Sequence, residues 1–515
     1  MTALQHILAQ FPLPISLWSI ALTFLLIFGL RKTDRLPLPP GPPPKWLTGN
    51  LHQLPKVEAW KTYAHWGRQY GPLVLIRVFG RKTLVLNSHA AVLDLLESRS
   101  SIYSERPIAW MYKILVERKW GVFNIATAHP RFKIYRKLLH ASMNPKVVQG
   151  YRALQTREAG VLLRALHSHP DKFISHLRRN AGAVILEIAY GWPVRDDDDY
   201  FVSIMEEGFK LQAELTRPGR WLVDVFPILR FIPAWFPGAD FQRQAVWYRE
   251  QLSRLDRIPH QWAMEQINSG VYTESFTSKN MRPSDGTIPN TEEEDIVKWC
   301  SAALYAGAAD TIVSSMTTFF LLMTLHPVAQ QRAQEEIDRV VGTDRLPTMD
   351  DREKLPYVGA LIKEVLRWSP PAPLGLPHSV TEEDAYQGWR IPKDTMVIAN
   401  IWALTHDPSV YPDPFAFNPD RFLSSSSSGS QFDPTQYVFG FGRRVCAGSH
   451  FAEVSLFLNI ASVLAAFSIL KPLDEGGKEY DPAAEFTSTI TSHPKPFSCR
   501  IVSRSSVLEA AVKEE

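Results

Sequence analysis

The sequence contains few cysteines, and no pair of them has the spacing of a metal-binding or redox motif. Its 515 residues include three, Cys300, Cys446 and Cys499. Three separated thiols cannot form a disulfide framework, and without a C-x-x-C pair the common zinc-ribbon and thioredoxin-like proteins are excluded. The chain also lacks an N-x-[ST] glycosylation sequence. Both features favour a reducing compartment for the main body of the protein.

The chain also lacks a large excess of charge. Its 56 basic and 53 acidic residues leave a net charge of +3. Because nucleic-acid-binding proteins usually carry a concentrated basic excess, this balance argues against a nucleic-acid partner. The sequence has no internal repeat and no G-x-G-x-x-G fingerprint on a βαβ pattern. Electrons for any redox reaction would therefore come from another protein.

One long uncharged segment lies near the N-terminus. Residues 13–30, LPISLWSIALTFLLIFGL, are about long enough to cross a bilayer core as a helix, and Arg31, Lys32 and Arg35 follow them. Basic flanks stay on the cytosolic side, so residues 1–35 are predicted to be an anchor whose downstream body faces the cytosol. A cleavable signal peptide would carry its basic residues before the apolar run. A buried core helix is disfavoured because no polar face interrupts the run.

Proline is abundant directly after this segment. Residues 36–44, LPLPPGPPP, cannot continue a helix and favour a stiff, extended conformation. They predict a hinge between the anchor and a body that spans residues 45–515.

The body reads as mainly α with small β-sheets. Residues 70–90 alternate apolar and polar positions around a turn, which predicts a β-hairpin. Helical patterns separated by proline-rich breaks run from Val92 to Leu366. Strand-like runs return at residues 388–401 and 486–502, and the serine-rich residues 424–430 predict a surface loop.

The segment FGFGRRVCAG, residues 439–448, sets Cys446 among glycines and arginines. A thiolate is a strong ligand for iron, and a thiolate-ligated haem needs only one cysteine. Gly440 and Gly442 permit a tight backbone that aims N–H groups at the sulfur, and Arg444 suits a carboxylate such as a haem propionate. The alternative is a small buried cysteine in a glycine-rich turn.

Five positions of this segment fit the pattern F-x-x-G-x-R-x-C-x-G, which resembles the haem-ligand signature of the cytochrome P450 family. They are Phe439, Gly442, Arg444, Cys446 and Gly448. The resemblance implies haem b, iron protoporphyrin IX, with Cys446 as the axial ligand of the iron. It also implies the P450 fold, in which the haem is buried between a long central helix and the cysteine loop. Gly448 would let the following helix approach the flat cofactor.

Two further segments resemble the part of the family that stabilises the fold around the haem. Glu364 and Arg367 form an E-x-x-R pair on a helix predicted to begin near Tyr357, and Arg421 lies in NPDRF. Taken alone, an acid–base pair at this spacing is a common solvated helix contact. The resemblance implies instead a buried Glu364, Arg367 and Arg421 cluster, which is costly unless fully paired.

The segment YAGAADTI, within the longest apolar helical pattern, resembles the family's oxygen-activating segment. The resemblance assigns proton delivery to Asp310 and Thr311. From the residues alone, small side chains let a ligand approach the helix backbone, and Thr311 can bond back to a carbonyl one turn earlier and open the helix. Ordinary small-residue helix packing is the alternative. Ala308 and Ile312 depart from the family pattern, which leaves the width of the pocket open.

Two further residues match positions that bind the haem propionates in the family. Arg136 lies in RFKIYRK, where Phe132 takes the place of the usual tryptophan, so the indole N–H donor is missing. His378 lies in LPHSV, where the family often has another propionate-binding group. A surface histidine is the alternative for His378.

The resemblance, which is strongest to fungal members that tailor secondary metabolites, implies a haem-thiolate monooxygenase. Its substrate would be a hydrophobic, aromatic or polycyclic metabolite, hydroxylated or epoxidised with O2. An NADPH-dependent P450 reductase would supply electrons, with cytochrome b5 as an optional second donor, at the cytosolic face of the endoplasmic reticulum. The protein would be single-pass and in contact with membrane lipid. Oxidative coupling, desaturation or rearrangement is the alternative at the same site, and neither motif nor spacing distinguishes them. A silent haem-binding protein and a nucleophilic Cys446 rank last.

Overall fold

The computed structural model describes residues 36–196, 198–424 and 430–504. The predicted anchor over residues 13–30 and most of the serine-rich segment lie outside these ranges. The described residues divide into two compact units, one comprising residues 36–39 with Glu383–Pro392 and the other the remaining described residues from Pro40 onward.

The smaller unit contains a short antiparallel hairpin. Strands β4 (Asp384–Tyr386) and β5 (Trp389–Ile391) pair across a turn in which Gln387 and Gly388 both have positive φ angles, of 49° and 79°. Two consecutive positive φ values match the right-handed twist of a tight hairpin. The N–H of Arg390 donates to the carbonyl of Pro37 at 2.8 Å, so Pro37, near the start of the predicted hinge, pairs with this hairpin.

The larger unit contains a four-stranded sheet in the order β1-β2-β6-β3. The predicted hairpin is confirmed as β1 (Leu73–Val78) and β2 (Arg81–Leu86), which turn at Phe79 and Gly80. Strand β6 (Met396–Ala399) runs parallel to β2, and β3 (His378–Ser379) is antiparallel to β6.

Most of the larger unit is helical, as the sequence predicts. The long helices are α3 (Ala59–Tyr70), α6 (Pro130–Met143), α8 (Arg152–Ser168), α9 (Phe173–Tyr190), α10 (Tyr200–Leu215), α12 (Asp240–Ser269), α14 (Thr291–Leu325), α15 (Pro327–Val340), α16 (Pro356–Trp368) and α19 (Ser449–Ala466). The short ones are α4 (His89–Val92), α5 (Ser100–Tyr103), α7 (Pro145–Gly150), α11 (Leu222–Val225), α13 (Phe276–Met281), α17 (Ile401–Thr405) and α18 (Thr435–Val438).

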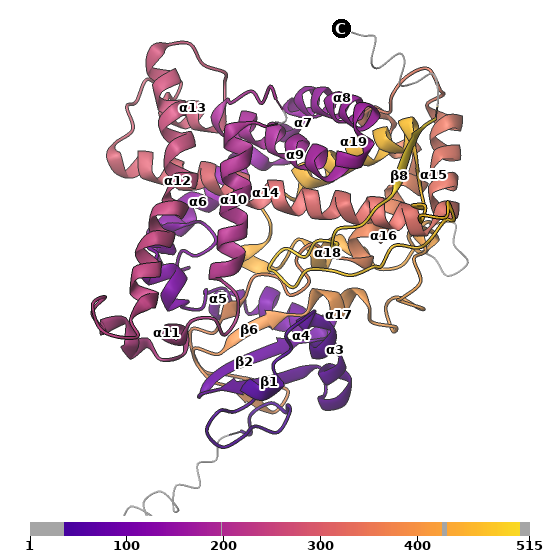
Figure 1. Cartoon of the computed structure of the whole chain (residues 1–515). Coiled ribbons are helices and arrows are strands. Elements are labelled where there is room, and N and C mark those ends of the chain that lie inside the picture. The colour runs from indigo at the N-terminus through magenta and orange to yellow at the C-terminus, as the bar shows by residue number, and fades with distance from the viewer. Residues whose placement is uncertain (1–35, 197, 425–429, 505–515) are drawn as a thin grey trace, which may run out of the picture. The chain divides into compact units, whose positions relative to one another are not determined.

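Helix α14 is the centre of the core. Figure 1 shows it running through the helical body, and α9 and α19 pack against it. Its start is fixed by a capping box, in which the Asn290 side chain accepts from the N–H of Glu293 while the Glu293 carboxylate accepts from the N–H of Asn290. Helices α14 and α19 are both apolar enough to span a membrane, but 78% of each apolar window is buried inside the protein. Both are therefore core helices.

The C-terminal part of the chain forms less strand than the sequence predicts. Strand β7 (Phe467–Leu470) pairs with β8 (Arg500–Ser503), so the expected strand over residues 486–502 is wrong for most of its length. Its first part is a loop closed by a single bridge between Phe486 and Pro494. Pro494 and Pro496 have no N–H to donate, which interrupts a β-ladder at this point.

Candidate active site

Cys446 lies in a loop whose backbone requires glycine. The loop follows η9 (Gly442–Arg444), and the N–H of Cys446 donates to the carbonyl of Phe439 at 2.8 Å. Gly440 and Gly442 have φ angles of 75° and 58°. A Cβ atom on Gly442 would lie 2.2 Å from the carbonyl oxygen of Leu96, so a larger residue cannot fit there without a backbone shift.

Cys446 is a free cysteine that is exposed to solvent. Protein around its thiol nevertheless raises the pKa of that thiol through desolvation, and the N–H of Gly448 and the charge of Arg136 oppose the rise. Gly448 is thus the main-chain N–H donor near the sulfur. A Cβ atom on Gly448 would meet no other atom within 4 Å, so open space lies beside this glycine.

Arg444 extends from this loop to residues far away in sequence. Its Nε donates to the Ser104 carbonyl at 3.0 Å, and its Nη2 donates to the Ile125 carbonyl at 2.7 Å and to Thr127 Oγ1 at 3.0 Å. The guanidinium also lies 4.3 Å from the centre of the Phe132 ring. Phe132, in the position where the resemblance expects tryptophan, thus packs against a cation in place of donating an N–H. Burial lowers the pKa of Arg444 to about 10.

A buried arginine that no sequence motif predicted, Arg106, lies beside the half-buried Arg444. Nη1 of Arg106 donates to the carbonyls of Leu376 and Pro377, both at 2.7 Å. Among the described residues its Nε is buried without a hydrogen-bond partner. Burial, with Arg444 as the second cause, lowers the pKa of Arg106 to about 9. Arg106 stands in an irregular segment after α5, and no motif in the sequence marks it.

The cations in this region exceed the carboxylates that neutralise them. Lys113 is also buried, and its pKa is lowered by burial, with Arg444 and Arg106 contributing. Glu105 lies among them, but its carboxylate accepts from the main-chain N–H groups of Arg106 and Thr127, both at 2.8 Å. Buried charges are costly unless they are paired. The region is therefore suited to an anionic ligand.

His378 and Arg136 border the same region. Nδ1 of His378 lies 2.7 Å from the Tyr103 carbonyl, and the residue is buried, so the surface-histidine alternative is wrong. Burial, followed by Arg106, lowers the pKa of His378 to about 3, which keeps its imidazole neutral. Nη1 of Arg136, on α6, donates to the Val445 carbonyl at 2.8 Å and thereby ties α6 to the cysteine loop.

Asp310 and Thr311 lie in the middle of α14. Thr311 Oγ1 donates to the Gly307 carbonyl at 2.9 Å, the predicted bond one turn back. The helix is nevertheless continuous, so the predicted opening is wrong. The hydroxyl adds a second donor to the Gly307 carbonyl without displacing the backbone bonds. Asp310 Oδ1 is 2.9 Å from Nε2 of His493, a contact from the C-terminal loop that the sequence analysis missed.

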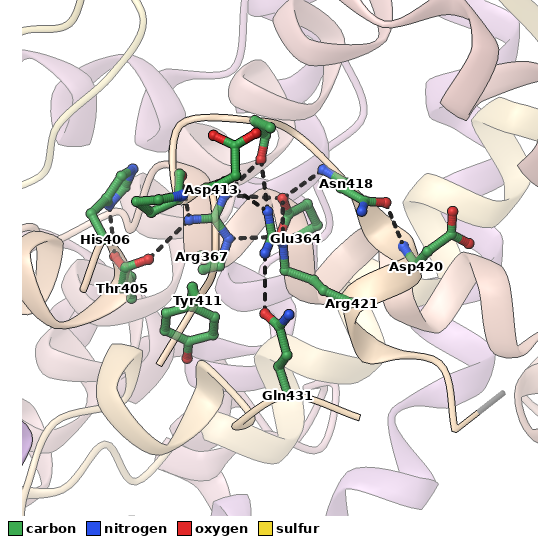
Figure 2. Close-up of polar contacts among 12 residues, drawn as sticks. Glu364, Arg367, Thr405, His406, Tyr411, Asp413, Asn418, Asp420, Arg421 and Gln431 are labelled. Carbon is green, nitrogen blue, oxygen red and sulfur yellow. Dashed lines mark hydrogen bonds and ion pairs between the residues drawn. The ribbon is translucent and has the colours of Figure 1, made fainter. Parts of the chain in front are cut away.

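Glu364, Arg367 and Arg421 come together as the resemblance implies (Figure 2). Arg367 on α16 contacts both carboxylate oxygens of Glu364, at 2.7 and 2.9 Å, and Nε of Arg421 lies 3.3 Å from Oε1. All three side chains are buried. The other guanidinium N–H groups donate to the carbonyls of Thr405, Pro412, Asp413, Pro414 and Ala416 and to the side chain of Gln431.

Comparison with known proteins gives a consistent family. Residues 39–500 match the model of the family described as Cytochrome P450. Cytochrome P450 monooxygenase 208 of Postia placenta is 40% identical over 96% of this chain and 95% of that protein. Cytochrome P450 monooxygenase claR of Ampulloclitocybe clavipes is 38% identical over 99% of this chain and 94% of its own length. Cytochrome P450 monooxygenase COX2 of Coprinopsis cinerea is 38% identical, with coverages of 92% and 91%.

Proposed function

This chain belongs to the cytochrome P450 family of oxidoreductases, and on that premise we propose that Cys446 is the axial thiolate ligand of a bound haem b. The observation that carries the proposal is the Cys446 loop, which holds one free thiol beside the N–H donor of Gly448 and, in the same loop, the cation Arg444. Within the described residues, no group of three or more His, Cys, Asp or Glu side chains could hold a metal ion. Ligation by a single cysteine is consistent with that.

The residues near Cys446 fit a haem. The two propionates of the haem would supply negative charge beside the cations Arg106, Arg444 and Lys113. The Nε of Arg106, which has no hydrogen-bond partner among the described residues, could donate to one propionate. The empty space beside Gly448 leaves room for the flat ring. When bound, the haem supplies the oxidising chemistry, because thiolate ligation favours cleavage of the O–O bond.

The chain itself positions the substrate and the protons. The Thr311 hydroxyl is held by the Gly307 carbonyl, and Asp310 is the adjacent acid, so the pair can move a proton toward the site. Phe123 packs over Gly307, because a Cβ atom on that glycine would lie 3.3 Å from Phe123 Cζ. An aromatic wall against the small-residue part of α14 favours an apolar substrate and excludes water.

We infer a hydrophobic substrate, aromatic or polycyclic, that is hydroxylated or epoxidised in secondary metabolism. The fungal relatives are named monooxygenases, which supports the insertion of oxygen. Electrons would come from an NADPH-dependent reductase, with cytochrome b5 as an optional donor. The uncharged run over residues 13–30 supports a single-pass anchor in the endoplasmic reticulum with the body in the cytosol.

The ligand assignment is tested by Cys446→Ala, with Cys499→Ala as the matched control because Cys499 is also a free thiol. The thiolate-type spectrum of the reduced, carbon-monoxide-treated protein should disappear in Cys446→Ala and persist in Cys499→Ala. Persistence of that spectrum in Cys446→Ala would refute the assignment.

The reaction is tested by comparing the metabolites of the host with those of a strain that lacks the gene, by accurate mass. An accumulating compound that lacks one oxygen relative to the lost product identifies hydroxylation or epoxidation and the substrate. A difference in hydrogens alone, or loss of a dimer, contradicts oxygen insertion and favours desaturation or coupling.

A further inference from the structure

The C-terminal loop brings a histidine to the acid of α14. Nε2 of His493 lies 2.9 Å from Oδ1 of Asp310, although 183 residues separate them. Their side chains are 22% and 25% exposed, so the pair is neither buried in the core nor free in solvent. A polar contact at this exposure adds little to the stability of the fold. Its effect on the geometry of Asp310 is therefore the more informative question.

The loop that carries His493 is closed on itself. The N–H of Thr487 donates to the His493 carbonyl at 2.8 Å, and the N–H of His493 donates to Thr487 Oγ1 at 2.9 Å. Phe486 and Pro494 form the β-bridge next to this pair. These hydrogen bonds fix the main chain of His493, so the position of its Cα and Cβ atoms relative to α14 is defined.

The same loop is held on α14 at a second point. Ser314 Oγ donates to the Ser492 carbonyl at 2.5 Å, and the N–H of Ser492 donates to the Pro371 carbonyl at 2.8 Å. Asp310 and Ser314 are four residues apart and share one face of the helix. Two adjacent loop residues, Ser492 and His493, thus contact two α14 residues one turn apart.

We propose that His493 is a positioning residue for Asp310. Its Nε2–H donates to Oδ1 and holds the carboxylate in one orientation on the loop-facing side of α14. A short acidic side chain on a helix otherwise rotates among its rotamers and points into solvent for part of the time. The proposal rests on the proposed function, in which Asp310 handles protons beside Thr311.

The proposal is tested with His493→Leu, which removes the N–H donor, and His493→Gln, whose amide restores one at similar reach. His167→Leu is the control, because His167 is an exposed histidine whose Nδ1 contacts Ser503 Oγ, on β8 rather than on α14. The full-length, haem-loaded protein is given its reductase, NADPH and O2 without added substrate. Hydrogen peroxide formed per NADPH oxidised is measured, together with amide hydrogen exchange over residues 486–494.

In His493→Leu we expect the share of electrons lost as peroxide to rise toward that of Asp310→Asn. Exchange over residues 486–494 should become about two- to tenfold faster, as loss of one ordinary hydrogen bond predicts. His493→Gln and His167→Leu should stay near wild type in both readouts. If His493→Leu leaves both unchanged, or if His493→Gln is as impaired as His493→Leu, the proposal is overturned.

The carbon-monoxide spectrum of the wild-type protein distinguishes failure of the His493 proposal from failure of the proposed function. If the wild-type protein lacks a thiolate-type spectrum, the proposed function is wrong, and the hydrogen-exchange comparison still decides whether His493 holds Asp310.

Discussion

Two groups of arginines, one fully buried and one partly buried, differ in how their charge is balanced. Arg367 and Arg421 share the carboxylate of Glu364, and each guanidinium donates all five of its N–H groups to oxygen atoms of the chain (Figure 2). Arg106 and Arg444 instead lie near a single carboxylate, Glu105, whose oxygens accept from main-chain N–H groups, and the Nε of Arg106 has no hydrogen-bond partner among the described residues.

The difference separates a structural cluster from a binding one. A buried ion pair is tolerable when every donor and acceptor is satisfied, and costly when one is left alone. The Glu364 cluster is completed by the chain itself, so its role is to hold the segments that supply its carbonyls. The Arg106 and Arg444 group remains incomplete within residues 36–196, 198–424 and 430–504, which supports its proposed role as a site for an anionic ligand.

The largest effect is expected from breaking the complete cluster. Arg367→Leu leaves Glu364 buried with Arg421 as its remaining cation, and removal of one partner from a buried pair costs about 3–5 kcal/mol. Urea unfolding measures the change. Arg332→Leu is the control, because Arg332 makes a bidentate pair with Asp420 in which the side chains are 45% and 40% exposed, and such pairs are worth about 1 kcal/mol or less. Equal losses in the two variants would contradict a structural role for the cluster.

Substitution in the Arg106 and Arg444 group is expected to have a smaller effect, on the rate of haem release rather than on unfolding. Arg444→Leu removes a proposed charged donor to the propionates, so haem should be released about 10- to 100-fold faster, in line with the strength of hydrogen bonds to charged groups. Transfer of haem to an excess of apomyoglobin measures the rate. The neighbouring Arg443 is exposed, and Arg443→Leu should release haem at the wild-type rate. Identical rates in both variants would remove Arg444 from the haem site.

The sequence predicted contacts between residues that are close in sequence better than contacts between residues that are far apart in sequence. Glu364 and Arg367 are three residues apart on a helix, so periodicity already puts them on one face. Arg421 entered through the family resemblance, since composition and spacing do not show that NPDRF returns to α16. Arg106 was missed because its partners are carbonyls at residues 376 and 377, which only the folded chain brings near.

The same reasoning applies to the fold and to α14. The helices and the β1–β2 hairpin were predictable because their periodic patterns are local. The C-terminal strand was overestimated because an apolar run does not reveal where a partner strand ends, and proline there limits pairing. The opening of α14 at Thr311 was wrong, since a back-bonded hydroxyl is compatible with an intact helix. The His493 contact has no local signal at all.

One buried histidine lies beside each arginine cluster, so the pH dependence of stability can be compared between the two clusters. Burial lowers the pKa of His378, beside Arg106, and of His406, beside Arg367, each to about 3 from 6.5. Between pH 6.5 and 3 the unfolded chain binds a proton at each position and the folded chain does not, so stability falls as the pH is lowered. His378→Gln and His406→Gln should each reduce that fall in the haem-free protein, as acid titration of urea unfolding at fixed temperature would measure.

Bound haem should make the effects of His378→Gln and His406→Gln on acid stability differ. Propionates next to Arg106 would favour a protonated His378 by Coulombic attraction, so in the haem-loaded protein the benefit of His378→Gln should shrink. The benefit of His406→Gln should persist, because the charges around Glu364 are already matched within the chain. Haem could instead change the gain in acid stability of both His→Gln variants equally, or of neither. The two clusters would then not differ in their need for a negatively charged ligand, and the cations around Arg444 would have to be explained by the fold alone.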